Sequence, residues 1–156
     1  MQSIIYTDTD RIRSVLGVDD KDIKDNQVTD RDLEKELRLD LLSWVSNHAA
    51  LYTTGTTGTP TEPQKSVADA LTLYSTYFCA ILVVKSLQLA APQAIADGKN
   101  SLSRFAAMDW QGMSAHLKER AAFYKTFIQD ATATNAVTVY TAFAGVGLAV
   151  DPVTSV

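Results

Sequence analysis

The side chains best suited to acid–base or nucleophilic catalysis in this chain are two histidines, His48 and His116, and one cysteine, Cys79. Cys79 lies within an uninterrupted apolar run, Tyr77–Val84, so a buried and unreactive thiol is expected, and a single cysteine cannot form an internal disulfide. His48 closes an apolar helical stripe, and His116 falls on a polar helix face. No Gly-x-Ser-x-Gly element is present. We therefore predict that the protein is not an enzyme and has no catalytic residue.

Carboxylates are the next candidates, because they are ligands for metal ions. Asp19, Asp20, Asp22 and Asp25 gather in one connector. A calcium loop counted from Asp20 would place Asp25 at the sixth position, where glycine is required. The glycine pairs of the chain lack the lysine or the strand–turn–helix context of phosphate and dinucleotide sites. The sequence predicts neither a metal site nor a cofactor.

Composition indicates one globular domain that does not bind nucleic acid by neutralising phosphates. The chain has 156 residues, 46% of them hydrophobic, and a net charge of −4. Residues 1–52 contain eleven Asp/Glu and seven Lys/Arg, a balance of 7 − 11 = −4, so the remainder is neutral. The N-terminal residues show no secretory signal, and we expect the protein to be made in a cytoplasm.

The residues that could position any site are organised around one long helix, Gln64–Ala91. This stretch has no internal Gly or Pro, and its apolar residues recur at three- and four-residue steps. A membrane span is the rival interpretation. The unbroken apolar run covers only eight residues, Tyr77–Val84, whereas a span needs about twenty. We expect the core helix of a soluble protein, with no membrane contact.

Three further helices complete an all-α prediction, a small helical bundle over residues 1–130. They are expected near 9–16, 30–51 and 110–130, with Asp8 or Thr9, a Thr29–Asp32 capping box and Asp109 at their starts, and Gly17 ending the first. Thr53–Pro63 is expected to be an exposed loop. The predicted core consists of Leu37, Leu41, Trp44, Leu71, Phe78, Leu82, Leu117 and Tyr124.

The last 26 residues, 131–156, differ in character. Asp151 is their only charge, and Val139, Tyr140 and Phe143 favour extended backbone. We expect an extended arm, because the apolar residues keep no helical stripe. An arm with so little charge needs cover, either by adding a strand to another chain or by folding back as a hairpin on its own bundle.

Three stretches resemble head–tail connector adaptor (head completion) proteins of tailed bacteriophages. They are Ile12–Val18 with the acidic connector Asp19–Asp25, the long helix followed by Ile95–Phe105, and the closing helix with Trp110, Leu117-Lys118 and Arg120-Ala121. The resemblance covers about residues 8–130. Neither the Thr53–Pro63 loop nor the arm has a matching motif.

The resemblance implies a structural subunit of a ring, dodecameric in the family, that docks beneath the portal protein. Such a ring connects the capsid to a tail or neck component and continues the DNA channel, without sequence-specific DNA binding. The implied location is the virion neck, after assembly in the host cytoplasm. The expected interface residues are Lys99, Ser101, Arg104, Phe105, Val139, Tyr140 and Phe143. The alternative function is a free-standing helical interaction module with a regulatory role.

Two outcomes stay open for Ile95–Phe105. Lys99 and Arg104 can pair with acids of an adjacent subunit or the portal, for which the net-negative first 52 residues are candidates. Alternatively, the segment is a surface loop whose Arg104 caps its own domain.

Overall fold

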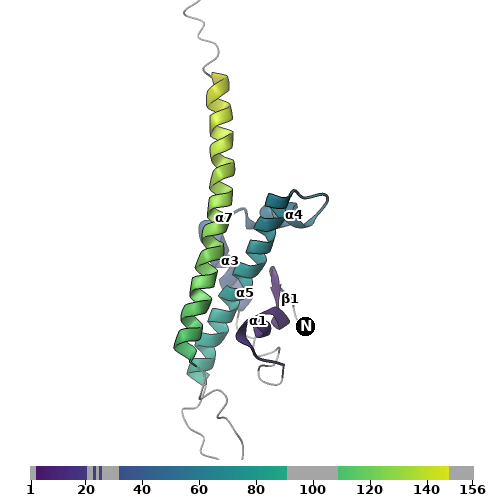
Figure 1. Ribbon diagram of the computed structural model, residues 1–156. Helices are drawn as coiled ribbons and strands as arrows, with labels where there is room; N and C mark the ends of the chain where they lie inside the picture. The colour runs from purple at the N-terminus through teal and green to yellow at the C-terminus, as the bar shows by residue number, and fades with distance from the viewer. Residues whose placement is uncertain (1–2, 21–22, 24, 26–31, 91–108, 148–156) are drawn as a thin grey trace, which may run out of the picture.

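The computed structural model describes residues 3–20, 23, 25, 32–90 and 109–147, with the backbone alone for 3, 88–90 and 134–147. Its elements are β1 (Ser3–Ile4), β2 (Thr7–Asp8), α1 (Thr9–Leu16), α3 (Leu33–Trp44), α4 (His48–Thr56), α5 (Glu62–Ala90) and α7 (Trp110–Gly147). Figure 1 shows α5 and α7 side by side, with the other elements grouped around α5. The predicted all-α bundle with a long central helix is confirmed.

Helix α5 is the centre of the bundle. It contacts α1, α3, α4, α7 and β2, and its most extensive contact is with α7. The helix starts two residues earlier than predicted, because Pro63 fits the first turn, where its missing N–H has no helical partner to lose. By length and composition Glu62–Leu87 could cross a membrane, but 67% of its apolar window is buried inside the protein, as in a core helix.

Half of the predicted core is fully buried and half lies at its edge. Leu37, Leu41 and Leu71 are 0% exposed and Leu117 is 2% exposed. The larger predicted residues are only partly buried, although they pack against the core; they are Trp44, Phe78, Leu82 and Tyr124. Tyr74 is almost completely buried and stacks on Phe78, so the central aromatic position is one turn earlier on α5 than the prediction placed it.

A short hairpin precedes α1 and was not predicted. Strands β1 and β2 are antiparallel, with Ser3 opposite Asp8 and Ile4 opposite Thr7. The Thr7 hydroxyl lies 2.7 Å from the Thr76 hydroxyl of α5, a buried contact that fixes the hairpin on the central helix. The caps of α1 are confirmed, since Asp8 accepts a hydrogen bond from the Arg11 backbone N–H and Gly17 has a left-handed conformation.

The predicted helix 30–51 is two helices. Helix α3 begins at Leu33 and ends at Trp44, and Val45 takes an extended φ of −143° that lets its side chain enter the core. The chain resumes as α4 at His48. Thr29 lies outside the described residues, and Asp32 makes no side-chain cap. The predicted Thr53–Pro63 loop is also wrong in its first part, because α4 continues to Thr56.

The predicted extended arm is wrong for residues 131–147, because α7 continues through Ala131 to Gly147 (Figure 1). The start of this helix is as predicted, with Asp109 accepting a hydrogen bond from the Gly112 N–H at 2.9 Å. Residues 131–144 contain neither Gly nor Pro. A helix that is already nucleated gains one hydrogen bond for each residue added, so no apolar stripe is required to extend it. Residues 148–156 lie outside the described part.

Candidate interaction site

The side chains suited to catalysis are kept apart in the structure. Cys79 is fully buried, and burial, with a further contribution from the charge of Glu36, raises the pKa of its thiol to about 12. His48 is on α4 and His116 is on the exposed side of α7. Within the described residues, no group of three His, Cys, Asp or Glu side chains could hold a metal ion.

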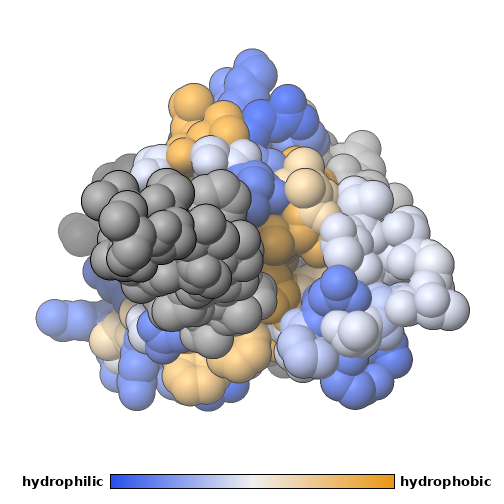
Figure 2. Space-filling model, turned by 90° about the horizontal axis from the view of Figure 1, so that it is seen from above, coloured by the Kyte–Doolittle hydropathy of each residue, from blue (hydrophilic) through white to orange (hydrophobic). Residues whose placement is uncertain are grey.

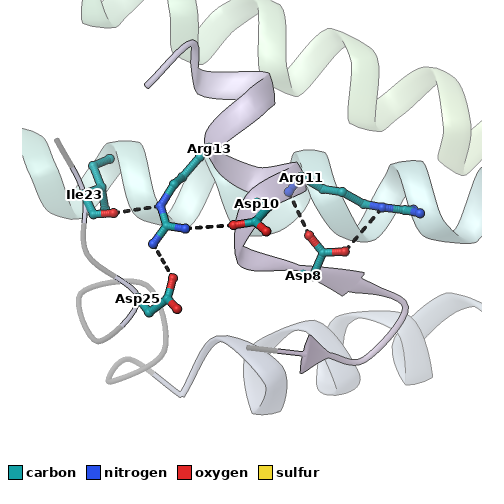
Figure 3. Close-up of polar contacts among 6 residues, drawn as sticks. All are labelled: Asp8, Asp10, Arg11, Arg13, Ile23 and Asp25. Atoms are coloured by element: carbon teal, nitrogen blue, oxygen red, sulfur yellow. Dashed lines mark hydrogen bonds and ion pairs between the residues drawn. The ribbon is translucent and has the colours of Figure 1, made fainter. Parts of the chain in front are cut away.

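Arg13 joins the acidic connector to α1 (Figure 3). Its side chain is 7% exposed, its Nε donates to the Ile23 carbonyl at 2.7 Å, and its two terminal nitrogens pair with Asp10 and Asp25. The hydrogen bond from Arg13 holds the pKa of Asp25 below its ordinary value. These contacts make the connector a structural attachment to α1.

A second polar cluster joins α3 to α5. The Asp40 carboxylate accepts hydrogen bonds from the Trp44 indole N–H, at 3.0 Å, and from the Tyr74 hydroxyl. Burial, followed by this hydrogen bond, raises the pKa of Tyr74, which therefore stays protonated. Lys125 of α7 lies 4.9 Å above the Trp44 ring, so α3 also touches one flank of α7.

The opposite flank of α7 carries an arginine among aromatic rings. The Arg120 guanidinium lies 5.4 Å from the Tyr124 ring centre, 5.7 Å from that of Phe123 and 6.0 Å from that of Tyr77 on α5. It donates a hydrogen bond to the Tyr124 hydroxyl at 2.9 Å. Hydrogen bonding to Tyr77, followed by the interaction with Tyr124, raises the pKa of Arg120. This cluster holds a fixed positive charge at the surface.

Apolar side chains next to this charge are open to solvent. Phe123 is 58% exposed and Phe127 is 41% exposed. A separate group on α3 is also open to solvent, since Leu39 is 69% exposed and Leu42 is 47% exposed. Figure 2 shows hydrophobic patches interrupting the hydrophilic surface when the molecule is viewed from above. Exposed aromatic and aliphatic groups beside charges are characteristic of protein–protein interaction surfaces.

The residues predicted to form the interface are not brought together by the described structure. Lys99, Ser101, Arg104 and Phe105 lie outside the described residues. Val139, Tyr140 and Phe143 are on α7, in its part described by backbone alone, and they are helical and not extended. The interface role of the four residues in 99–105 stays a prediction. For the three residues of α7, the expected extended backbone is replaced by a helix.

Sequence reasoning missed the cluster at Arg120. Phe123 and Phe127 are four residues apart, and Arg120 is three residues before Phe123, so all three share one face of the helix. That spacing was a detectable signal. The predicted core included Leu117 and Tyr124 of this helix but did not consider the aromatic pair Phe123 and Phe127 beside them.

Comparisons of the chain with protein-family models, with curated proteins and with solved structures found no match.

Proposed function

We propose that the protein is a structural head–tail adaptor of a tailed bacteriophage, a subunit of a ring beneath the portal that connects the capsid to the tail. The observation that carries the proposal is the shape and chemistry of α7. Its C-terminal half extends beyond α4 and α5 in Figure 1, and residues 131–147 contain no Asp, Glu, Lys or Arg. A projecting helix without charge is suited to packing against a neighbouring chain.

The charge of the protein supports a passive role toward DNA. A net charge of −4 disfavours binding to phosphates, so DNA would move through the channel of such a ring without being held. The absence of a metal cluster among the described residues is compatible with a structural subunit, which needs only surfaces for contact.

The proposed partners are further copies of the chain in a dodecameric ring, the portal protein and a tail or neck component. In this proposal Lys99 and Arg104 pair with acids of the adjacent subunit or the portal, and Ser101 and Phe105 belong to the same interface. Residues 131–147 pack as a helix on a neighbouring subunit, through Val139, Tyr140 and Phe143.

The second candidate is a free-standing helical interaction module with a regulatory role. The exposed Phe123 and Phe127 indicate an interaction surface, which both a ring subunit and a regulatory module would need. The two functions differ in assembly, because a ring subunit forms a large closed oligomer with a portal, whereas a regulator stays monomeric or dimeric.

Electron microscopy of the protein mixed with its proposed partner, the portal protein, tests the proposal. The expected result is a closed ring of this chain on the portal. Lys99→Glu with Arg104→Glu should prevent the ring without changing the melting temperature, whereas Lys118→Glu, an exposed change on α7, should leave it intact. A protein that stays monomeric or dimeric with the portal would support the regulatory module.

A further inference from the structure

Two surface patches contain four of the five large exposed apolar side chains found among the described residues. The first, on α3, consists of Glu36, Leu39 and Leu42 and is called the α3 patch. The second, on α7, consists of Arg120, Phe123 and Phe127 and is called the α7 patch. The fifth exposed side chain, Leu73, is on α5.

The two patches face different directions on one molecule. Lys125 lies over Trp44, so that flank of α7 faces α3. Phe123 is two residues before Lys125, which places it about 200° away around the helix axis. The α7 patch is therefore on the flank turned away from α3, and the α3 patch of the same chain cannot cover it.

The order of the residues is the same in the two patches, and the lengths of the patches are similar. Each has a charged residue followed by two apolar residues along the helix, at positions 36, 39 and 42 of α3 and 120, 123 and 127 of α7. With a rise of about 1.5 Å per residue, the patches are about 9 Å and about 10.5 Å long. Two helices laid parallel can therefore bring the charged ends of the two patches together, with the apolar residues of each patch beside those of the other.

The charges of the two patches are complementary. Arg120 is held by tyrosines and has no carboxylate partner in the part of the chain that the structure describes. Glu36 is exposed and forms no ion pair with the described residues, whereas nearby Glu34 is paired with Arg38 and Asp32 with Lys35. The α3 patch belongs to the first 52 residues, which have a net charge of −4. This negative charge attracts the positively charged Arg120 of the α7 patch.

We propose that the occupant of the α7 patch is the α3 patch of a second copy of this chain, with Glu36 paired to Arg120, Leu39 against Phe123 and Leu42 against Phe127. Because the contact joins two different surfaces, a bound pair of copies leaves one α3 patch and one α7 patch free, and repetition with a closing rotation produces a ring. This inference rests on the proposed ring and names a further contact between its subunits.

Disulfide cross-linking of the full-length protein at high concentration tests this contact directly. Cys79 is buried and its thiol has a raised pKa, so introduced cysteines are the reactive ones. Leu39→Cys mixed with Phe123→Cys should give a cross-linked dimer of the two variants. Each variant alone should give no dimer, and the double variant should give a ladder of higher oligomers. A dimer in either single variant, or none in the mixture, overturns the contact.

A charge exchange provides the second measurement, by sedimentation velocity. Glu36→Arg, an exposed change, should weaken self-association about tenfold, as should Arg120→Glu. The variant with both changes should recover association, and Lys118→Glu should have no effect. Equal association of Glu36→Arg and the wild type overturns the pairing. Rings on the portal without the Leu39–Phe123 cross-link would refute this contact alone, whereas the cross-link without portal rings would refute the proposed function.

Discussion

The Tyr6 hydroxyl and Nδ1 of His48 lie 2.7 Å apart, across 42 residues of sequence. Tyr6 has a positive φ of 64° in the turn between β1 and β2, and its ring lies 4.3 Å from that of Tyr52. His48 is the first residue of α4 and is 6% exposed. The contact therefore attaches the N-terminal hairpin to the start of α4, and burial, with the charge of Arg38 next, lowers the pKa of His48.

The lowered pKa of His48 predicts that the protein is less stable in mild acid. The unfolded chain binds the histidine proton more tightly than the folded chain. The free energy of unfolding therefore rises with pH between the pKa of His48 in the folded chain and its ordinary value. The contribution of His48 is complete above about pH 6.5, the ordinary histidine value, and is lost as the pH falls below it. Urea unfolding between pH 7.5 and about pH 5 measures the effect.

Two histidine variants control this measurement. His48→Gln cannot take up the proton and should reduce the slope of stability against pH in this interval. His116→Gln, on the exposed side of α7, should keep the wild-type slope. An unchanged slope in His48→Gln would contradict the assignment.

Gly55 permits the close packing of α4 on α5. A Cβ at this position would lie 2.4 Å from the Gln64 carbonyl oxygen and 2.5 Å from the Ala68 Cβ. Gly55→Ala should therefore push the helices apart and lower the free energy of unfolding by about 1–3 kcal/mol. Thr54→Ala, on the exposed side of α4, should change it by about 0.5 kcal/mol or less. Comparable denaturation midpoints for the two variants would show that α4 does not pack this closely.

Arg13 should contribute more to stability than its neighbour Arg11. Arg13→Leu leaves the Ile23 carbonyl without its donor and removes a buried charged group, which should cost on the order of 2 kcal/mol. Arg11 is 57% exposed and pairs with Asp8 at the surface, so Arg11→Leu should cost about 0–1 kcal/mol. Guanidinium unfolding curves of both variants measure the difference, and the reverse order would exclude Arg13 as the attachment of the connector.

Capping residues in the sequence were sufficient to predict the ends of helices that are set by side chains near in sequence. Asp8 and Gly17 mark the two ends of α1 where they were expected, and Asp109 marks the start of α7. The break at Val45 was not detectable in the same way, because it depends on a buried position for this side chain against other helices. The helical periodicity of the apolar residues continues through Val45, so the sequence pattern shows no break there.

The C-terminal segment was mispredicted because β-propensity was given more weight than continuity. Val139, Tyr140 and Phe143 favour strands on average, but tertiary context and an existing helix override such preferences. The interaction patches were missed for a different reason. Exposure of Phe123 or Leu39 depends on which helix face meets α5, and a sequence pattern with apolar residues on several faces does not determine that.

The final prediction concerns removal of the projecting part of α7. Among the described side chains of this helix, Ile128 is the last that is fully buried, Ala131 is the last that packs against the core, and Ala133 is exposed. Deleting residues 134–156 should therefore change the free energy of unfolding by less than about 0.5 kcal/mol. Ile128→Ala, on the same helix inside the bundle, should cost about 2–5 kcal/mol.

Assembly should respond to these two changes in the opposite way. The shortened protein should remain a folded monomer by circular dichroism and fail to form rings with the portal, because the uncharged helix that packs on its neighbour is gone. Ile128→Ala should retain assembly at temperatures where it is folded. Unfolding of the shortened protein would show that residues 134–156 stabilise their own bundle. Normal rings from it would show that the contacts between subunits do not depend on residues 134–156.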